Sequence, residues 1–242
     1  MSALETAQLT AQFIGDIPSN FMIDPNTYKR GSELGFQGMD FYVGGRGGAL
    51  GDVDGRVVAA SFFFFNPQMI VDAWNSSLNV MDRRSAGNEF ARCAHAWAEQ
   101  HFSDAIDFDR LASLLAQINN NVNPAGAPLF AGWLSLDKPQ TPKSRVIHEL
   151  NALRELRGAY HQAAILATGI SPREAVAIKT PYMLGIYGWD SPDSQAEPED
   201  LPTQDWQQAE QITNQLTSKV FEVLAQDEQQ ELVDLLSAIT LL

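Results

Sequence analysis

The chain is poor in cysteine and lacks long apolar runs. Cys93 is the one cysteine among its 242 residues, so an internal disulfide and a zinc site built from several cysteines are both excluded. No apolar run approaches the ~18 residues of a membrane span. The N-terminal stretch also lacks the basic region followed by an apolar region that marks a secretory signal. These features predict a cytoplasmic protein with no membrane partner.

Positive charge is also scarce. The chain holds 16 lysines and arginines against 30 acidic residues, a formal net charge of −14. Residues 189–242 contain one basic and twelve acidic residues, whereas residues 141–188 contain six basic and three acidic ones. Nucleic-acid binding depends on lysine and arginine contacts to phosphates, so we expect no nucleic-acid partner. The basic segment instead favours a small anionic molecule.

Signatures of catalytic and metal sites are absent from the sequence as well. It contains no GxSxG elbow, no HExxH pair and no DxDxDG loop. Cys93, His95, Glu99 and His101 have the side chains of metal ligands, but at 100° per residue only His95 and Glu99 share a helix face. We therefore predict no metal site, and for Cys93 a buried apolar role rather than a nucleophilic one.

Helical periodicity runs through most of the chain and predicts an all-α, multi-helix bundle of about ten helices. The apolar run from Val57 to Phe65 fits a buried strand or a short buried helix, and helix is favoured because no second such run could pair with it. The glycine-rich stretch from Gly35 to Gly51 lacks the Gly-Lys-Ser/Thr of a phosphate loop. We expect it to form a compact loop with one helical turn, in which Arg46 points inward or is paired.

The predicted domain organisation has three parts. Residues 1–188 form a helical domain with a pocket, and residues 189–202 form an acidic, proline-rich linker. Residues 203–242 form a C-terminal pair of helices, which is either separate or docked onto the first domain.

One long helix, from Lys143 to Thr168, organises the rest of the chain. Thr141 is expected to cap it, with Pro142 at its first position, and Gly169 is expected to end it. At 100° per residue, one stripe of this helix collects the apolar residues Val146, Ile147, Leu150, Leu153, Ala164 and Ile165.

Three polar residues, Arg154, Arg157 and His161, lie in the middle of this apolar stripe. His148 lies about 140° from His161 around the same helix and is expected to be exposed. Two guanidiniums and an imidazole therefore point towards the core, which predicts a site.

Different interpretations of these three residues stay open. An unpaired guanidinium is very costly to bury, so each arginine must meet a carboxylate, a carbonyl or a bound anion. The first interpretation is a buried ion-pair network with Glu89 or Asp72 as partner. The second is a pocket in which the arginines clamp the carboxylate or phosphate of a ligand. A stripe that faces solvent or a second subunit is a further alternative, which keeps a homodimer open.

In the pocket interpretation His161 binds the ligand or acts as the catalytic general acid or base. Arg46 of the glycine-rich stretch closes over the ligand, and aromatic side chains form the apolar wall. The candidate ligand-binding residues are Arg46, Phe62, Phe65, Arg154, Arg157, Tyr160 and Trp189.

Several segments match a known family pattern in the expected order. They are Gly45-Arg46 with Ala49-Leu50-Gly51, Ala59 to Phe65 with Pro67, Pro128 to Ala131, and Leu153 to Ile170. In these segments the chain resembles the SalK-like family, a group of largely uncharacterised bacterial proteins with a winged helix-turn-helix, MarR-like character. The resemblance implies that Arg46, Arg154, Arg157 and His161 occupy the signature positions of the family. It implies no established reaction.

The resemblance weakens towards the C-terminus. The family usually continues with a winged helix, whereas here the chain runs after Trp206 into an acidic final segment. We therefore expect a degenerate winged-helix architecture that lacks the recognition helix and the wing. Together with the negative charge, this disfavours DNA binding.

The sequence thus predicts a protein that binds a small anionic, partly aromatic or acyl molecule in a helical pocket with an arginine and histidine floor. A first alternative is a cofactor-free enzyme of specialised metabolism, with His161 as acid or base and with Arg154 and Arg157 stabilising an oxyanion. A degenerate transcriptional regulator is the second alternative. A haem-type ligand on His161 is the third, and no other cofactor is predicted.

Overall fold

The computed structural model describes residues 1–189 and 201–241 of the chain. Within them it is all-α, as predicted, and the one β-type contact is an isolated bridge between Phe102 and Leu241. The predicted linker at 189–202 falls mostly outside these described residues. The helices in the described part are α1 (Ala3–Ile23), α2 (Pro25–Leu34), α3 (Asp40–Gly48), α4 (Gly55–Phe62), α5 (Pro67–Ser77), α6 (Arg83–His101), α7 (Phe108–Asn121), α8 (Pro128–Leu134), α9 (Pro142–Ala167), α10 (Pro172–Lys179), the 3-10 helix η1 (Pro181–Met183), α11 (Thr203–Phe221) and α12 (Gln226–Ser237).

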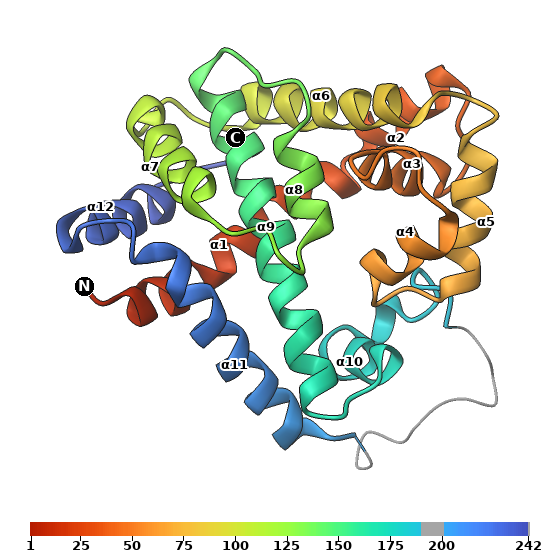
Figure 1. The fold of residues 1–242 in the computed structure, drawn as a ribbon. Helices are drawn as coiled ribbons and strands as arrows, with labels where there is room; N and C mark the ends of the chain where they lie inside the picture. Colours follow the sequence, from red (N-terminus) through yellow and green to blue (C-terminus); the bar gives the residue numbers. More distant parts are fainter. Residues whose placement is uncertain (190–200, 242) are drawn as a thin grey trace.

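The long helix α9 runs through the middle of the molecule, and α1, α6, α7, α8 and α11 pack against it (Figure 1). Pro142 begins the helix as predicted, but the Thr141 side chain does not cap it and donates instead to Oε1 of Glu99 at 2.5 Å. Gly169 follows with φ at +81°, the left-handed conformation that glycine adopts without strain. The exposure predicted for His148 is wrong, because residues 146–153 are all buried and His148 is 1% exposed. Helices surround this part of α9, so a single buried stripe does not describe it.

Asp40–Gly48 of the glycine-rich stretch form helix α3, which is longer than the one helical turn predicted within a loop. A Cβ on Gly48 would lie 2.2 Å from the carbonyl oxygen of Arg83, and a Cβ on Gly45 would lie 2.6 Å from Cβ of Phe90. Both neighbours belong to α6, so the glycines permit close packing of two helices. Glycine disfavours an isolated helix, and here tertiary packing outweighs that preference. Arg46 is therefore held on a buried helix, and not on a loop that could close over a ligand.

The run from Val57 to Phe65 is helical at first, as favoured, but α4 already ends at Phe62. Phe63 has φ at +33°, a backbone conformation that costs a bulky residue about 1–3 kcal/mol. The chain turns there, and Phe64 and Phe65 both lie in the wall of the cleft described below. A strained turn thus positions two aromatic side chains of the candidate site.

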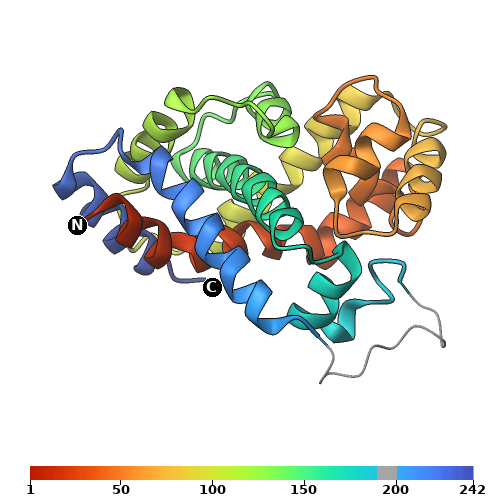
Figure 2. The same ribbon diagram turned by 60° about the horizontal axis from the view of Figure 1, so that its bottom comes forward.

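The two C-terminal helices dock onto the remainder of the chain. α11 packs along α1 and α9, and α12 packs against α1 and α7 (Figure 2). Pro202 precedes the first turn of α11, and no side chain among the described residues caps this end of the helix. In the part of the chain that the structure describes, no helix is both long and apolar enough to cross a membrane.

Candidate functional site

A cleft of about 330 Å³ lies beside α9 and brings most of the predicted site residues together. Tyr160 and Trp189 do not line it. Tyr160 packs against the main apolar core, and the indole N–H of Trp189 donates to the carbonyl oxygen of Phe64 at 2.7 Å. The predicted site residues that do line the cleft are Arg46, Phe62, Phe65, Arg154, Arg157 and His161.

A buried ion-pair network forms one wall of the cleft. Arg46 makes a two-point contact with Glu155, from Nε to Oε1 at 2.8 Å and from Nη2 to Oε2 at 2.7 Å. Nη1 of Arg46 also donates to the hydroxyl of Tyr42 at 3.2 Å. Arg154 shares the same carboxylate, donating from Nη1 to Oε1 at 3.2 Å, and its Nε donates to the hydroxyl of Ser19 at 3.1 Å. Two guanidiniums therefore share one carboxylate.

The partners that the sequence predicted for these arginines are wrong. Glu89 instead pairs with Arg30 and Arg92. Asp72 accepts a hydrogen bond from Gln68 within α5. Among the described residues, neither acidic side chain pairs with Arg154 or Arg157.

Burial and ion pairing shift the pKa values of Arg46 and Glu155 in opposite directions. Burial by itself would lower the pKa of the Arg46 guanidinium, but the charge of Glu155 and its hydrogen bonds raise that pKa above its usual range. Burial would likewise raise the pKa of the Glu155 carboxyl, but Arg46 and Arg154 outweigh it and lower the pKa. The carboxylate and both guanidiniums stay charged at neutral pH, which leaves one net positive charge.

Two further basic side chains, Arg157 and Lys179, line the cleft. Nη2 of Arg157 pairs with Oε2 of Glu210 at 2.9 Å, while the buried Nε of Arg157 has no hydrogen-bond partner among the described residues. Lys179, in the last turn of α10, lines the cleft, and no carboxylate in the described ranges pairs with it. Asp16 of α1 is an exposed member of the same wall. An adjoining hollow of about 610 Å³ shares these residues and extends to Trp206.

His161 is fixed in one tautomer by α11. The hydroxyl of Thr213 already donates to the carbonyl oxygen of Ala209 at 2.7 Å, so its oxygen accepts from Nδ1 of His161, 2.9 Å away. Nδ1 therefore carries the proton, and Nε2 presents a lone pair 3.8 Å from Oε1 of Glu210. Burial lowers the pKa of His161 to about 4, with Glu210 opposing the shift. The imidazole is neutral at physiological pH, and its Nε2 can accept a hydrogen bond from a bound molecule.

Aromatic rings make up much of the remaining wall. Phe64 lies against the imidazole of His161 with ring centroids 5.9 Å apart, and Trp206 meets the same imidazole edge-on at 5.1 Å. Phe65 packs on Tyr187 with centroids 4.4 Å apart. Rings in such arrangements bind flat apolar groups through contact area and stacking. The cleft thus places a basic wall and an aromatic wall within one small volume.

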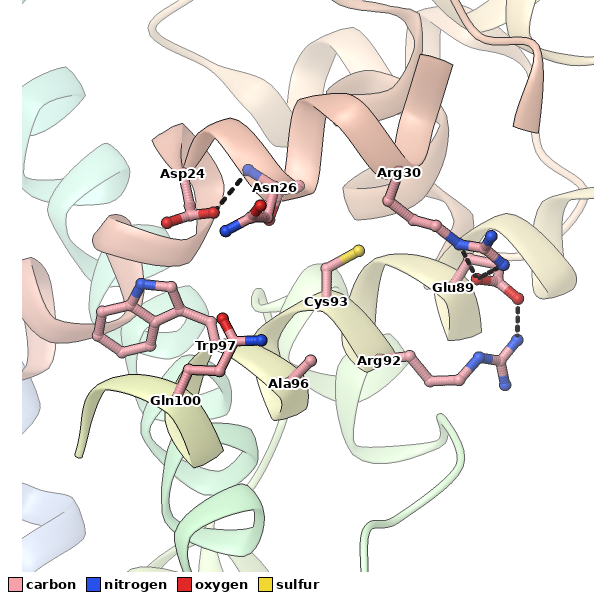
Figure 3. Close-up of a pocket in the computed structure, with 10 residues that line it drawn as sticks. Asp24, Asn26, Arg30, Glu89, Arg92, Cys93, Ala96, Trp97 and Gln100 are labelled. Carbon is pink, nitrogen blue, oxygen red and sulfur yellow. Dashed lines mark hydrogen bonds and ion pairs between the residues drawn. The ribbon is translucent and has the colours of Figure 1, made fainter. Parts of the chain in front are cut away.

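A second cavity of about 330 Å³ lies between α2 and α6 (Figure 3). Its two arginines are paired, because Glu89 accepts from both Arg30 and Arg92. Burial raises the pKa of the Cys93 thiol to about 11, so the thiol is protonated and a poor nucleophile at neutral pH. Across the described residues, no group of three or more histidine, cysteine, aspartate or glutamate side chains is placed to hold a metal ion.

The sequence did not reveal the acidic residues of the site. Glu155 directly follows Arg154, but it lies 100° further round α9 and so off the predicted stripe. Glu210 and Thr213 are three residues apart and share a face of α11. Their spacing could have marked that polar face, but no local signal indicates that α11 returns to pack on α9.

An all-helical protein with a basic and aromatic cleft beside its central helix is the class that the fold and the site define. The chain belongs to the helix-turn-helix family, because the model of a family with that description matches residues 7–241, nearly the whole chain. Comparison with curated proteins and with solved structures gives no match. Family membership confirms the helix-turn-helix part of the predicted resemblance, and its SalK-like and MarR-like details stay predictions.

Proposed function

We propose that the cleft binds a small organic anion that carries an aromatic or acyl group. The observation that carries the proposal is the charge of the walls, where four basic side chains meet three carboxylates. Lys179 and the Nε of Arg157 have no acidic partner within the described residues. Guanidinium and ammonium groups beside aromatic rings favour a carboxylate or a phosphate attached to an apolar body.

Each wall has a separate role in this proposal. Arg154 and Arg157 hold the anionic group, whereas Arg46 supports them through Glu155 because its own guanidinium already bonds that carboxylate and Tyr42. The aromatic wall takes the apolar body of the ligand. The resemblance to SalK-like proteins agrees with this choice, because all four signature residues that it implies line the cleft.

The tautomer of His161 favours a second candidate, catalysis without a cofactor. Nε2 is unprotonated at neutral pH, and Thr213 holds the ring in place, as a general base requires. A neighbouring arginine would stabilise negative charge that develops on the substrate. Given a substrate, the His161→Ala variant should lose turnover while it still binds the anion. Turnover equal to that of the wild type would rule out this role.

Family membership makes DNA binding a third candidate. Residues 203–237 contain seven acidic residues and one basic residue, which disfavours α11 or α12 as a recognition helix. A DNA-binding protein would show affinity for its own promoter that falls steeply with added salt.

Gly158 permits a test of the cleft that leaves every charge in place. Gly158 lines the cleft, and a Cβ built on it meets no atom within 4 Å. A leucine there would extend into the cleft. Because leucine is a better helix former than glycine by roughly 0.5–1 kcal/mol, the Gly158→Leu variant should be at least as stable as the wild type.

The measurement is calorimetric titration with benzoate and longer aryl alkanoates. Ala96→Leu is the matched control, because Ala96 lines the second cavity between α2 and α6 (Figure 3). We expect the probes to bind the wild type and Ala96→Leu but not Gly158→Leu. Equal binding to all three proteins would place the probe elsewhere and contradict the proposal.

A further inference from the structure

Glu210 reaches the cleft from α11, whereas Arg157 and His161 belong to α9. Its Oε2 lies 2.9 Å from Nη2 of Arg157, and its Oε1 lies 3.8 Å from Nε2 of His161. The side chain lines the larger, adjoining hollow. Glu210 thus occupies a place where a carboxylate of a ligand would otherwise meet Arg157.

The two carboxylates that are bonded to the arginines of the cleft differ in burial and in their number of partners. The side chain of Glu155 is 3% exposed and bonds two guanidiniums, whereas that of Glu210 is 34% exposed and bonds one. Displacing Glu155 would leave buried charges unpaired, which is strongly unfavourable. Glu210 pairs with Arg157 and also lines the open hollow. A second negative charge on a ligand would therefore lie next to this carboxylate.

The charge of the whole site is small and positive. Its walls and the carboxylates bonded to them give one net positive charge at neutral pH, since His161 is neutral. The charged members are Arg46, Arg154, Arg157, Lys179, Asp16, Glu155 and Glu210. One negative charge on a ligand balances this site, whereas a second would make the site net negative and would lie beside the carboxylate of Glu210.

We infer that Glu210 determines how many charges a ligand can carry, and that it makes the cleft selective for monoanions over dianions. The inference rests on the proposed binding of an organic anion and adds the charge class of that ligand. Glu210 acts here as a specificity-determining residue. When Glu210 carries no charge, a second carboxylate can lie beside Arg157 without repulsion.

The test compares benzoate with isophthalate, which have the same ring and carry one and two carboxylates. Glu210→Gln removes the charge but keeps the size and an oxygen that accepts from Arg157, so the contact between α9 and α11 is retained. Glu222→Gln is the matched control, because Glu222 follows the same helix and pairs with Lys219 on the surface. Dissociation constants are measured by calorimetry at low ionic strength, where charge effects are least screened.

We expect the wild type and Glu222→Gln to bind benzoate more tightly than isophthalate. In Glu210→Gln, the affinity for isophthalate relative to benzoate should rise by about tenfold, a change of about 1.4 kcal/mol. The double variant Arg157→Gln/Glu210→Gln removes both charges of the pair and should return to the preference of the wild type.

An unchanged ratio in Glu210→Gln, with both probes bound, would overturn the inference and leave the proposed function intact. A similar rise in Glu222→Gln would also overturn it, because the effect would then follow the net charge of the protein and not this position. If neither probe binds the wild type, the proposed function fails together with the inference.

Discussion

Glu155→Gln is expected to be among the most destabilising single changes in this chain. Glu155 accepts two hydrogen bonds from Arg46 and one from Arg154 inside the fold. The glutamine would leave two guanidiniums without their shared counter-charge, and removing one partner of a buried ion pair costs about 3–5 kcal/mol. Native proteins are stable by only about 5–15 kcal/mol. Urea unfolding followed by circular dichroism should therefore show a midpoint lowered by roughly 1 M or more.

Asp109→Asn is the matched control, because it disturbs an exposed ion pair that Asp109 makes with Arg145 on the same helix α9. The free energy of unfolding of this variant should lie within about 0.5 kcal/mol of that of the wild type. The double variant Arg46→Met/Glu155→Leu should be less destabilised than Glu155→Gln, because it buries no unmatched charge at Arg46. A Glu155→Gln protein as stable as the control would refute the argument that burial makes this pairing obligatory.

Three further predictions concern the stability of the fold. Gly48→Ala should destabilise the protein by about 1–3 kcal/mol, because its Cβ would lie 2.2 Å from a carbonyl oxygen of α6; thermal melting checks this, and an unchanged melting temperature would contradict the packing of α3. Asn151→Leu should stabilise it by about 1 kcal/mol, because both polar atoms of this fully buried asparagine lack partners in the described structure; a lower urea midpoint would contradict that. Acid should unfold the protein through His95 and His148, whose ring nitrogens lie 3.2 Å apart. Burial lowers their pKa values to about 4 and about 3, below the ~6.5 of an unfolded histidine. The free energy of unfolding is therefore at its full value with respect to these histidines above pH ~6.5. It decreases as the pH falls towards those pKa values, by up to about 1.4 kcal/mol per pH unit for each histidine. If the free energy of unfolding of a His148→Gln protein depended on pH as that of the wild type does, this prediction would be contradicted.

The sequence predicted those parts of the fold in which local and tertiary preferences agree. Pro142 begins α9, and Gly169 follows its last turn with φ at +81°, as predicted. In α9 the apolar stripe is buried, and the three polar residues within it reach one cleft. Periodicity and capping are local properties, so a single sequence reveals them.

The errors arise where tertiary packing outweighs local preference. The glycines of α3 looked like a loop because the helix α6 that packs against them lies far along the chain. His148 looked exposed because the prediction assumed one buried face, whereas helices surround that part of α9. The partners Glu155 and Glu210 depend on how α3, α9 and α11 meet, and periodicity contains no information about that.

The most direct test of the central claim is an NMR titration that follows the Nε–Hε signals of the arginine side chains while benzoate is added. Binding in the cleft predicts that the signals of Arg154 and Arg157 shift together and reach saturation, while that of Arg145, on the surface of the same helix, stays unchanged. Saturating shifts at Arg30 and Arg92 instead would place the anion in the second cavity, and no saturating shift at any arginine would mean that it does not bind. Either result would contradict the claim that this cleft binds an organic anion.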